Sequence, residues 1–206
     1  MSLVIVDYGL GNLNSVKNMI LKLGHDCSIS SDPKKIFESN KLILPGVGSF
    51  DSGIKNLNRL NIFDLLNIKV KEHRTPILGI CLGAQLMLNR SDEGNLKGFG
   101  WIKGNVRSFQ QEFKKSKIEF PTPSMGWRSV KQKKKSNLLF IKRSRFYFVH
   151  SYFFDLEEKK YAILESNYGI NFVSGFQKHN IFGVQFHPEK SHKYGFFLLK
   201  SFLDNV

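Results

Sequence analysis

Cysteine is scarce in this chain, and that scarcity excludes several classes of protein. Only Cys27 and Cys81 occur among the 206 residues, far apart and in unrelated sequence contexts. Two such thiols do not make the disulfide framework of a small secreted domain, and no cysteine or histidine cluster has the spacing of zinc ligands. We therefore expect a reducing, cytoplasmic environment and no metal site.

Long apolar runs are missing as well. No apolar stretch approaches the roughly 20 residues that a membrane-spanning helix needs, and the apolar run 3–6 reads as a first strand rather than as a signal peptide. The Gly9-Leu10-Gly11 turn that follows lacks the third glycine and the downstream acid of a dinucleotide-binding loop. We expect no membrane association, no cofactor, and one α/β domain over residues 1–206.

Acidic residues are outnumbered: 17 Asp and Glu stand against 31 Lys and Arg, for a net charge of +14. The excess concentrates between Lys103 and Arg145, where thirteen basic residues accompany only Glu112 and Glu119. Such runs are most often solvated surface. A docking surface for an acidic partner is the second interpretation. Nucleic-acid binding ranks third, because no reader motif accompanies the charge, and we predict no nucleic-acid partner.

The first 80 residues alternate between apolar runs and segments with helical spacing. Strands are predicted at 3–6, 27–30, 41–44 and 77–80. Helices are predicted after the candidate caps Asn12 and Asp32, and over about 49–71 as one broken helix or two. This alternation predicts a doubly wound, mainly parallel sheet with helices on both faces, in which functional sites form at the carboxyl ends of the strands.

The second half of the chain changes character. Short strands separated by turns are predicted at 105–109, 127–131, 145–154, 161–166, 171–177 and 181–186. An amphipathic helix over 192–203 closes the chain. This pattern predicts an antiparallel layer of strands added to the parallel core.

Cys81 lies in the most informative segment, Gly79-Ile80-Cys81-Leu82-Gly83, between a predicted strand and the start of a predicted helix. A nucleophile flanked by small residues at such a junction is the sequence form of a nucleophile elbow. A nearby helix N-terminus stabilises a thiolate, and the amide after the nucleophile can face an oxyanion. The pattern predicts attack by Cys81 on an acyl carbon, with a structural core cysteine as the alternative.

His187 and Glu189 supply the other half of this chemistry. The segment Phe186-His187-Pro188-Glu189 closes an apolar run, and the alternation of a strand would place both side chains on one face. Glu189 can then accept from one ring nitrogen of His187 while the other faces the thiol, as in a nucleophile–base–orienter triad. A surface turn is the alternative interpretation of this segment.

Four segments carry a resemblance to a known family. They are DYGLGNLNSV (7–16), LPGVGSF (44–50), GICLGAQLM (79–87) and VQFHPEKS (184–191). With them the chain resembles, end to end, the class I, triad-type glutamine amidotransferases, and more narrowly the glutaminase subunits of imidazole glycerol phosphate synthase. The resemblance implies hydrolysis of L-glutamine to glutamate and ammonia, with Cys81 as nucleophile, His187 as proton carrier and Glu189 as orienter.

The resemblance also implies where the remaining groups act. The oxyanion hole would take the amide of Leu82 and one from the segment containing Val47 and Gly48. The glycines beside Val47 would let that peptide turn at low cost, so we hypothesise that only a docked partner completes the hole. Residues implied for glutamine binding are Gly46, Gln85, Glu93, Ser151 and Tyr152. Residues implied for the partner interface are Asn12, Trp127 and Lys190.

The implied partner is a synthase or cyclase subunit of the (β/α)8-barrel type, bound as a heterodimer. One departure leaves its identity open, because Gly126-Trp127-Arg128 stands where the resembling subunits usually carry Gly-Trp-Asn. The chain then serves either histidine biosynthesis or, as a paralogue, sugar amidation in surface-polysaccharide synthesis. Two further alternatives are a cysteine peptidase or γ-glutamyl hydrolase on the same fold, and a non-catalytic binding module whose cysteine is structural.

Overall fold

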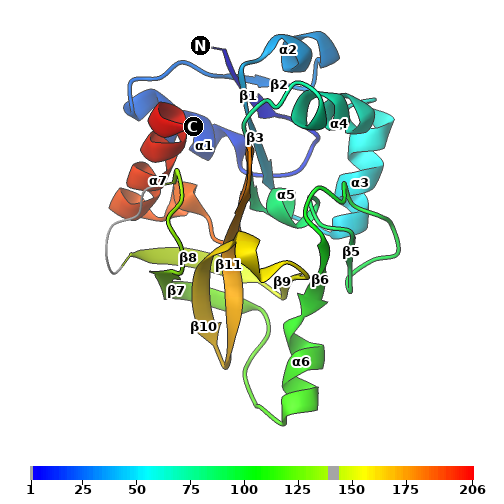
Figure 1. Cartoon of the computed structure of the whole chain (residues 1–206), viewed down its shortest axis with the longest axis vertical. Helices are drawn as coiled ribbons and strands as arrows, with labels where there is room; N and C mark the ends of the chain where they lie inside the picture. Colours follow the sequence, from blue (N-terminus) through cyan, green and yellow to red (C-terminus); the bar gives the residue numbers. More distant parts are fainter. Residues whose placement is uncertain (1, 139–143) are drawn as a thin grey trace.

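The structure is a computed structural model that describes residues 2–138 and 144–206. Its described strands form one sheet (Figure 1). The parallel half contains, in spatial order, β2 (Ser28–Ser30), β1 (Leu3–Val6), β3 (Lys41–Gly46), β4 (Ile77–Cys81) and β12 (Ile181–Val184). This half matches the parallel core predicted from the alternation of the sequence.

An antiparallel extension continues the sheet beyond β12. It runs through β11 (Ile170–Lys178), β10 (Ala162–Tyr168), β7 (Ser124–Gln132) and β8 (Arg145–His150). A branch from β11 adds β9 (Tyr152–Leu156), β6 (Gly104–Ser108) and β5 (Arg90–Ser91). The predicted antiparallel layer is therefore confirmed, as an extension of the same sheet.

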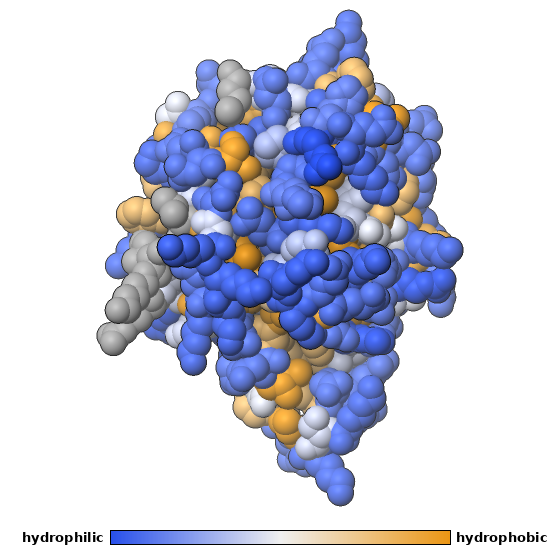
Figure 2. All heavy atoms as spheres, viewed as in Figure 1, coloured by the Kyte–Doolittle hydropathy of each residue, from blue (hydrophilic) through white to orange (hydrophobic). Residues whose placement is uncertain are grey.

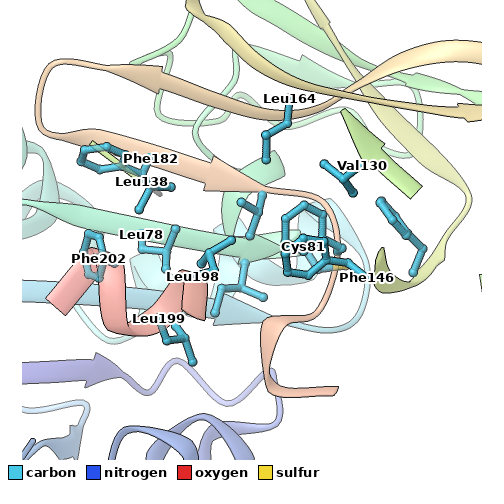
Figure 3. Packing of buried hydrophobic residues seen from close by; sticks show 14 of the residues in the cluster. Leu78, Cys81, Val130, Leu138, Phe146, Leu164, Phe182, Leu198, Leu199 and Phe202 are labelled. Carbon is cyan, nitrogen blue, oxygen red and sulfur yellow. The ribbon is translucent and has the colours of Figure 1, made fainter. Parts of the chain in front are cut away.

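Helices cover both faces of the parallel half, as predicted (Figure 1). One face carries α1 (Leu13–Lys22) and α7 (His192–Asn205), and the other carries α2 (Pro33–Glu38), α3 (Phe50–Arg59) and α4 (Phe63–Lys71). Strand alternation explains this division, since Ile5 packs into the cluster of α1 and α7 while its neighbours Val4 and Val6 pack into the other. Figure 3 shows the first cluster, with Leu198, Leu199 and Phe202 of α7 against β4.

Several predicted boundaries need correction. The strand predicted over 145–154 is two strands, β8 and β9, because the chain turns at Ser151. The predicted strand 105–109 ends one residue early, and Phe109 instead begins the unpredicted helix α6 (Phe109–Ser116). Asp32 caps α2 as predicted, accepting from Lys34 N, whereas Asn12 precedes α1 without a side-chain cap bond.

The molecular surface is mostly hydrophilic on the face shown in Figure 2. None of the helices in the described residues combines the length and apolarity needed to cross a membrane. Lys142 and Arg143 of the predicted basic segment lie outside the described residues.

Candidate active site

Cys81 is the last residue of β4 and adopts φ 52° and ψ −113°, a conformation that non-glycine residues rarely occupy. The turn is tight because α5 (Leu82–Gln85) starts at once and packs against β3. Gly83 must be a glycine here, since a Cβ at that position would lie 1.8 Å from the carbonyl oxygen of Leu44. The strain and the close packing are those of the nucleophile elbow that the sequence predicts.

The helix after Cys81 is shorter than the sequence pattern suggests. α5 spans four residues and ends at Gln85, although the apolar residues Leu86, Met87 and Leu88 that follow would suit a longer helix. A single turn carries little macrodipole, so the predicted stabilisation of a thiolate by helix charge is weak at this site.

His187 and Glu189 meet as predicted, although for a different local reason. The Nδ1 atom of His187 lies 2.7 Å from Oε1 of Glu189, and both side chains are buried. β12 ends at Val184, and the segment Pro188–Lys190 is a turn of 3₁₀ helix. The turn, rather than strand alternation, brings Glu189 back to the imidazole, and Tyr147 fixes His187 by accepting from its backbone N–H at 2.9 Å.

The protonation of His187 depends on both of its neighbours. Its Nε2 makes no well-aligned hydrogen bond with a described residue. Cys81 nevertheless interacts with the imidazole and favours its protonated form. Such bonds are often long without substrate. Burial lowers the pKa of His187, but attraction to Cys81 and the hydrogen bond to Glu189 outweigh it and raise the pKa to about 10. The imidazolium therefore persists beside Cys81 at neutral pH.

A pair of buried amides stands next to Cys81. The Nε2 of Gln185 lies 3.6 Å from Cys81 Sγ, and the Oε1 of Gln185 accepts from Nε2 of Gln85 at 3.1 Å. Gln185 is not among the residues predicted from the sequence, although its position two residues before His187 could have indicated it. Gln85, predicted to bind substrate, already has this partner within the protein. Cys81 itself is only 7% exposed, at the edge of the hydrophobic cluster in Figure 3.

The segment predicted to complete the oxyanion hole lies beside the nucleophile. Gly46 pairs with Cys81 in the β3–β4 register, which confirms that the two strand ends share an edge. Val47 and Gly48 follow immediately, and both are exposed, Val47 at 49%. Leu82 is buried at the first position of α5, where its backbone N–H has no intrahelical acceptor.

Glu93 and Tyr152 lie together near the start of α3. The Glu93 Oε2 accepts from the backbone N–H of Phe50 at 2.7 Å. Burial raises the pKa of Glu93, against the opposing bond from Phe50, and burial with the charge of Glu93 raises that of Tyr152. Both side chains are half-buried, as is Ser151 before Tyr152. Between Cys81 and Glu93 the chain passes through α5 and β5.

The three predicted interface residues are all exposed, so the structure leaves them free to meet a partner. Asn12 precedes α1, and the Trp127 ring, 38% exposed, stacks on His192 with ring centres 5.6 Å apart. The ammonium of Lys190 lies 5.8 Å from the centre of the Tyr147 ring.

Comparison with known proteins agrees with this geometry. The family model for class I glutamine amidotransferases matches residues 4–205. Among solved structures, a glutamine amidotransferase superposes with a TM-score of 0.74 at 15% identity, covering 96% of this chain and 98% of that one. PurLQS from Thermotoga maritima gives 0.74 at 18% identity, covering 98% and 97%. The fold is that of a class I glutamine amidotransferase, and the family model spans Cys81, His187 and Glu189.

Sequence relatives narrow the assignment. Subunit HisH 2 of imidazole glycerol phosphate synthase from Methanococcus maripaludis is 50% identical over 205 residues, 98% of each chain. Subunit HisH from Bdellovibrio bacteriovorus is 40% identical over 200 residues, 96% of this chain and 97% of that one. This chain belongs to the class I glutamine amidotransferases and, within them, to the HisH glutaminase subunits.

Proposed function

We propose that this chain hydrolyses L-glutamine with Cys81 as nucleophile and delivers the ammonia to the synthase subunit of imidazole glycerol phosphate synthase, in histidine biosynthesis. The observation that carries the proposal is a strained Cys81 that raises the pKa of a buried His187, whose Nδ1 lies 2.7 Å from Oε1 of Glu189. A peptidase or hydrolase on this fold would use the same groups, but the HisH relatives favour transfer of ammonia.

In this mechanism the Cys81 thiolate attacks the side-chain amide carbon of glutamine. The carbonyl electrons move onto oxygen, and the tetrahedral oxyanion collapses to a thioester as the C–N bond breaks. His187 gives its proton to the leaving ammonia, then takes a proton from water, whose oxygen attacks the thioester and restores the thiolate. Glu189 keeps the imidazole in the orientation and tautomer that these transfers need.

The oxyanion is held by backbone donors in this proposal. Leu82 N–H supplies one, and Val47 N–H or Gly48 N–H supplies the second when the peptide turns toward Cys81. Because Val47 and Gly48 are exposed, a docked partner can contact this segment directly and change the orientation of its peptide. The isolated chain is then expected to hydrolyse glutamine slowly.

For substrate recognition, Glu93 binds the α-ammonium of glutamine, and Ser151 and Tyr152 face its carboxylate. Gly46 lines the pocket. Gln85 acts indirectly, through its hydrogen bond to Gln185. Burial raises the pKa of Glu93, and a substrate cation beside its carboxylate would favour the ionised form. The exposed residues Asn12 before α1, Trp127 of β7 and Lys190 after His187 would contact a partner of (β/α)8-barrel type in a heterodimer.

Arg128 bears on the choice of ammonia acceptor. Its guanidinium lies 3.9 Å from the centre of the Tyr168 ring, and its Nε donates to Ser124 Oγ at 2.9 Å. The side chain is therefore engaged within its own sheet. We propose the histidine-pathway acceptor, because the HisH relatives are subunits of imidazole glycerol phosphate synthase.

The test measures glutamate release by the purified chain with and without the imidazole glycerol phosphate synthase partner. We expect hydrolysis to rise at least about tenfold with the partner and Cys81→Ser to abolish it while the fold is retained. Full activity of the isolated chain would contradict the partner requirement. Normal hydrolysis by Cys81→Ser would contradict the nucleophile, and cleavage of peptides without a partner would favour the peptidase.

A further inference from the structure

Tyr8 is a buried side chain that the mechanism above does not use. It follows β1, is completely buried, and its hydroxyl makes no hydrogen bond with any described residue. A buried hydroxyl without a partner destabilises the fold, because it has lost its hydrogen bonds to water. A phenylalanine would fill the same space without that cost, so the hydroxyl calls for an explanation.

The hydroxyl lies directly against the end of β3. A Cβ built on Gly46 would be 2.2 Å from the Tyr8 hydroxyl oxygen and 2.8 Å from the backbone nitrogen of Gly83. Tyr8 therefore occupies the space between the segment leading to Val47 and the first turn after Cys81. Gly46 cannot carry a side chain without displacing it.

The strand order decides which backbone group Tyr8 can reach. β3 lies between β1 and β4, and its pairing with β1 ends at Ile43, three residues before Gly46. Within one peptide unit the N–H and C=O point in opposite directions. If the Val47 N–H points to the β4 side, toward Cys81, the Gly46 C=O must point to the β1 side. The backbone of Tyr8 follows β1 on that side, and its ring reaches across to the position that a Cβ on Gly46 would occupy.

We propose that Tyr8 is a positioning residue whose hydroxyl donates to the Gly46 carbonyl when the Val47 N–H turns toward the oxyanion, and so stabilises the active form of the hole. The inference rests on the proposed glutaminase reaction and adds a residue to it. The resting structure lacks this bond and leaves the hydroxyl unsatisfied. Formation of the bond removes that cost only in the active form.

The protonation of Tyr8 suits a permanent donor. Burial, and then the charge of Cys81, raise its pKa well above the ordinary value, so the hydroxyl keeps its proton throughout the working pH range.

The experiment compares Tyr8→Phe with the wild-type chain, both in complex with the synthase subunit. Tyr168→Phe is the matched control, because it removes the hydroxyl of another buried tyrosine. That hydroxyl donates to the carbonyl oxygen of Pro121, at a distance of 2.5 Å, in the antiparallel extension. Three quantities are measured: kcat and KM for glutamine hydrolysis, the rate of Cys81 alkylation by iodoacetamide, and the unfolding temperature. Alkylation needs the thiolate but no oxyanion hole.

We expect Tyr8→Phe to lower kcat about tenfold, with KM and the alkylation rate changed by less than about twofold and an unfolding temperature no lower than wild type. Tyr168→Phe should leave kcat unchanged. An unchanged kcat in Tyr8→Phe would overturn the inference, as would an equal fall in the alkylation rate, which would indicate damage to the nucleophile. If the wild-type complex hydrolyses no glutamine, the proposed function fails first and this inference fails with it.

Discussion

His187 is the residue whose chemistry depends most on its surroundings. Burial lowers the pKa of His187, whereas Cys81 and Glu189 raise it. The net effect is a raised pKa. A raised pKa means that the imidazolium survives to higher pH and is lost only as the pH rises toward about 10. This residue can therefore protonate the leaving ammonia under conditions in which a free imidazole would be neutral.

Replacement of Glu189 should reveal this dependence. In Glu189→Gln the charge that favours the imidazolium is lost, so the pKa of His187 should fall and the alkaline limb of kcat/KM should move to lower pH. We expect kcat to fall about a hundredfold or more because the imidazole also loses its orientation. Glu157→Gln, at an exposed position, is the control. An alkaline limb that stays in place would show that Glu189 does not set the protonation of His187.

Among the secondary-structure elements, α7 is held to the sheet by a buried cation. Lys41 begins β3 and is 1% exposed, and its ammonium donates to the carbonyl oxygens of Phe202 at 2.9 Å and Leu203 at 2.7 Å. The last carbonyls of a helix have no intrahelical donor, so the lysine satisfies two of them. These two hydrogen bonds join β3 to α7 although the bonded residues are 161 and 162 positions apart in the sequence.

Loss of this lysine should destabilise the fold without touching the chemistry. We expect Lys41→Ala to lower the free energy of unfolding by about 2–4 kcal/mol, because it leaves buried carbonyls unsatisfied and opens a cavity. The matched control is Lys200→Ala in α7, whose exposed pair with Asp204 should contribute less than about 0.5 kcal/mol. Urea unfolding of both variants measures the difference. Equal, small effects would mean that α7 does not depend on Lys41.

The elements also show what the sequence could and could not predict. β1, β3 and β4 follow from short apolar runs, and those of β3 and β4 end in Gly46 and Cys81, so the edge carrying Cys81 could be predicted. α6 was missed because its eight residues bury only Phe109 and Phe113, a single helical step. The break at Ser151 was missed because the residues on either side of it are uniformly strand-forming. Gln185 and Tyr8 matter only through contacts between distant strand ends, which periodicity does not reveal.

Taken as a whole, the molecule separates its reactive edge from much of its excess charge. Cys81, Val47 and Lys190 belong to the edge at which the parallel strands end. Lys133, in the basic segment, follows β7 and pairs with Glu165 of β10, within the antiparallel extension. Two docking surfaces are thus conceivable, the reactive edge and the basic segment. Transfer of ammonia requires the first, because only there can a partner cover Cys81.

Charge reversal on each surface separates these two possibilities. We expect Lys190→Glu to weaken binding of the synthase subunit about tenfold and to reduce its stimulation of glutamine hydrolysis, since complementary charge at an interface controls association. Lys133→Glu changes the net charge equally and should leave both quantities unchanged. Titration of each variant with the synthase subunit gives the Kd and the maximal rate. If Lys133→Glu alone weakens binding, the partner docks on the basic segment, and the route from Cys81 to the acceptor must be longer than an interface at the reactive edge allows.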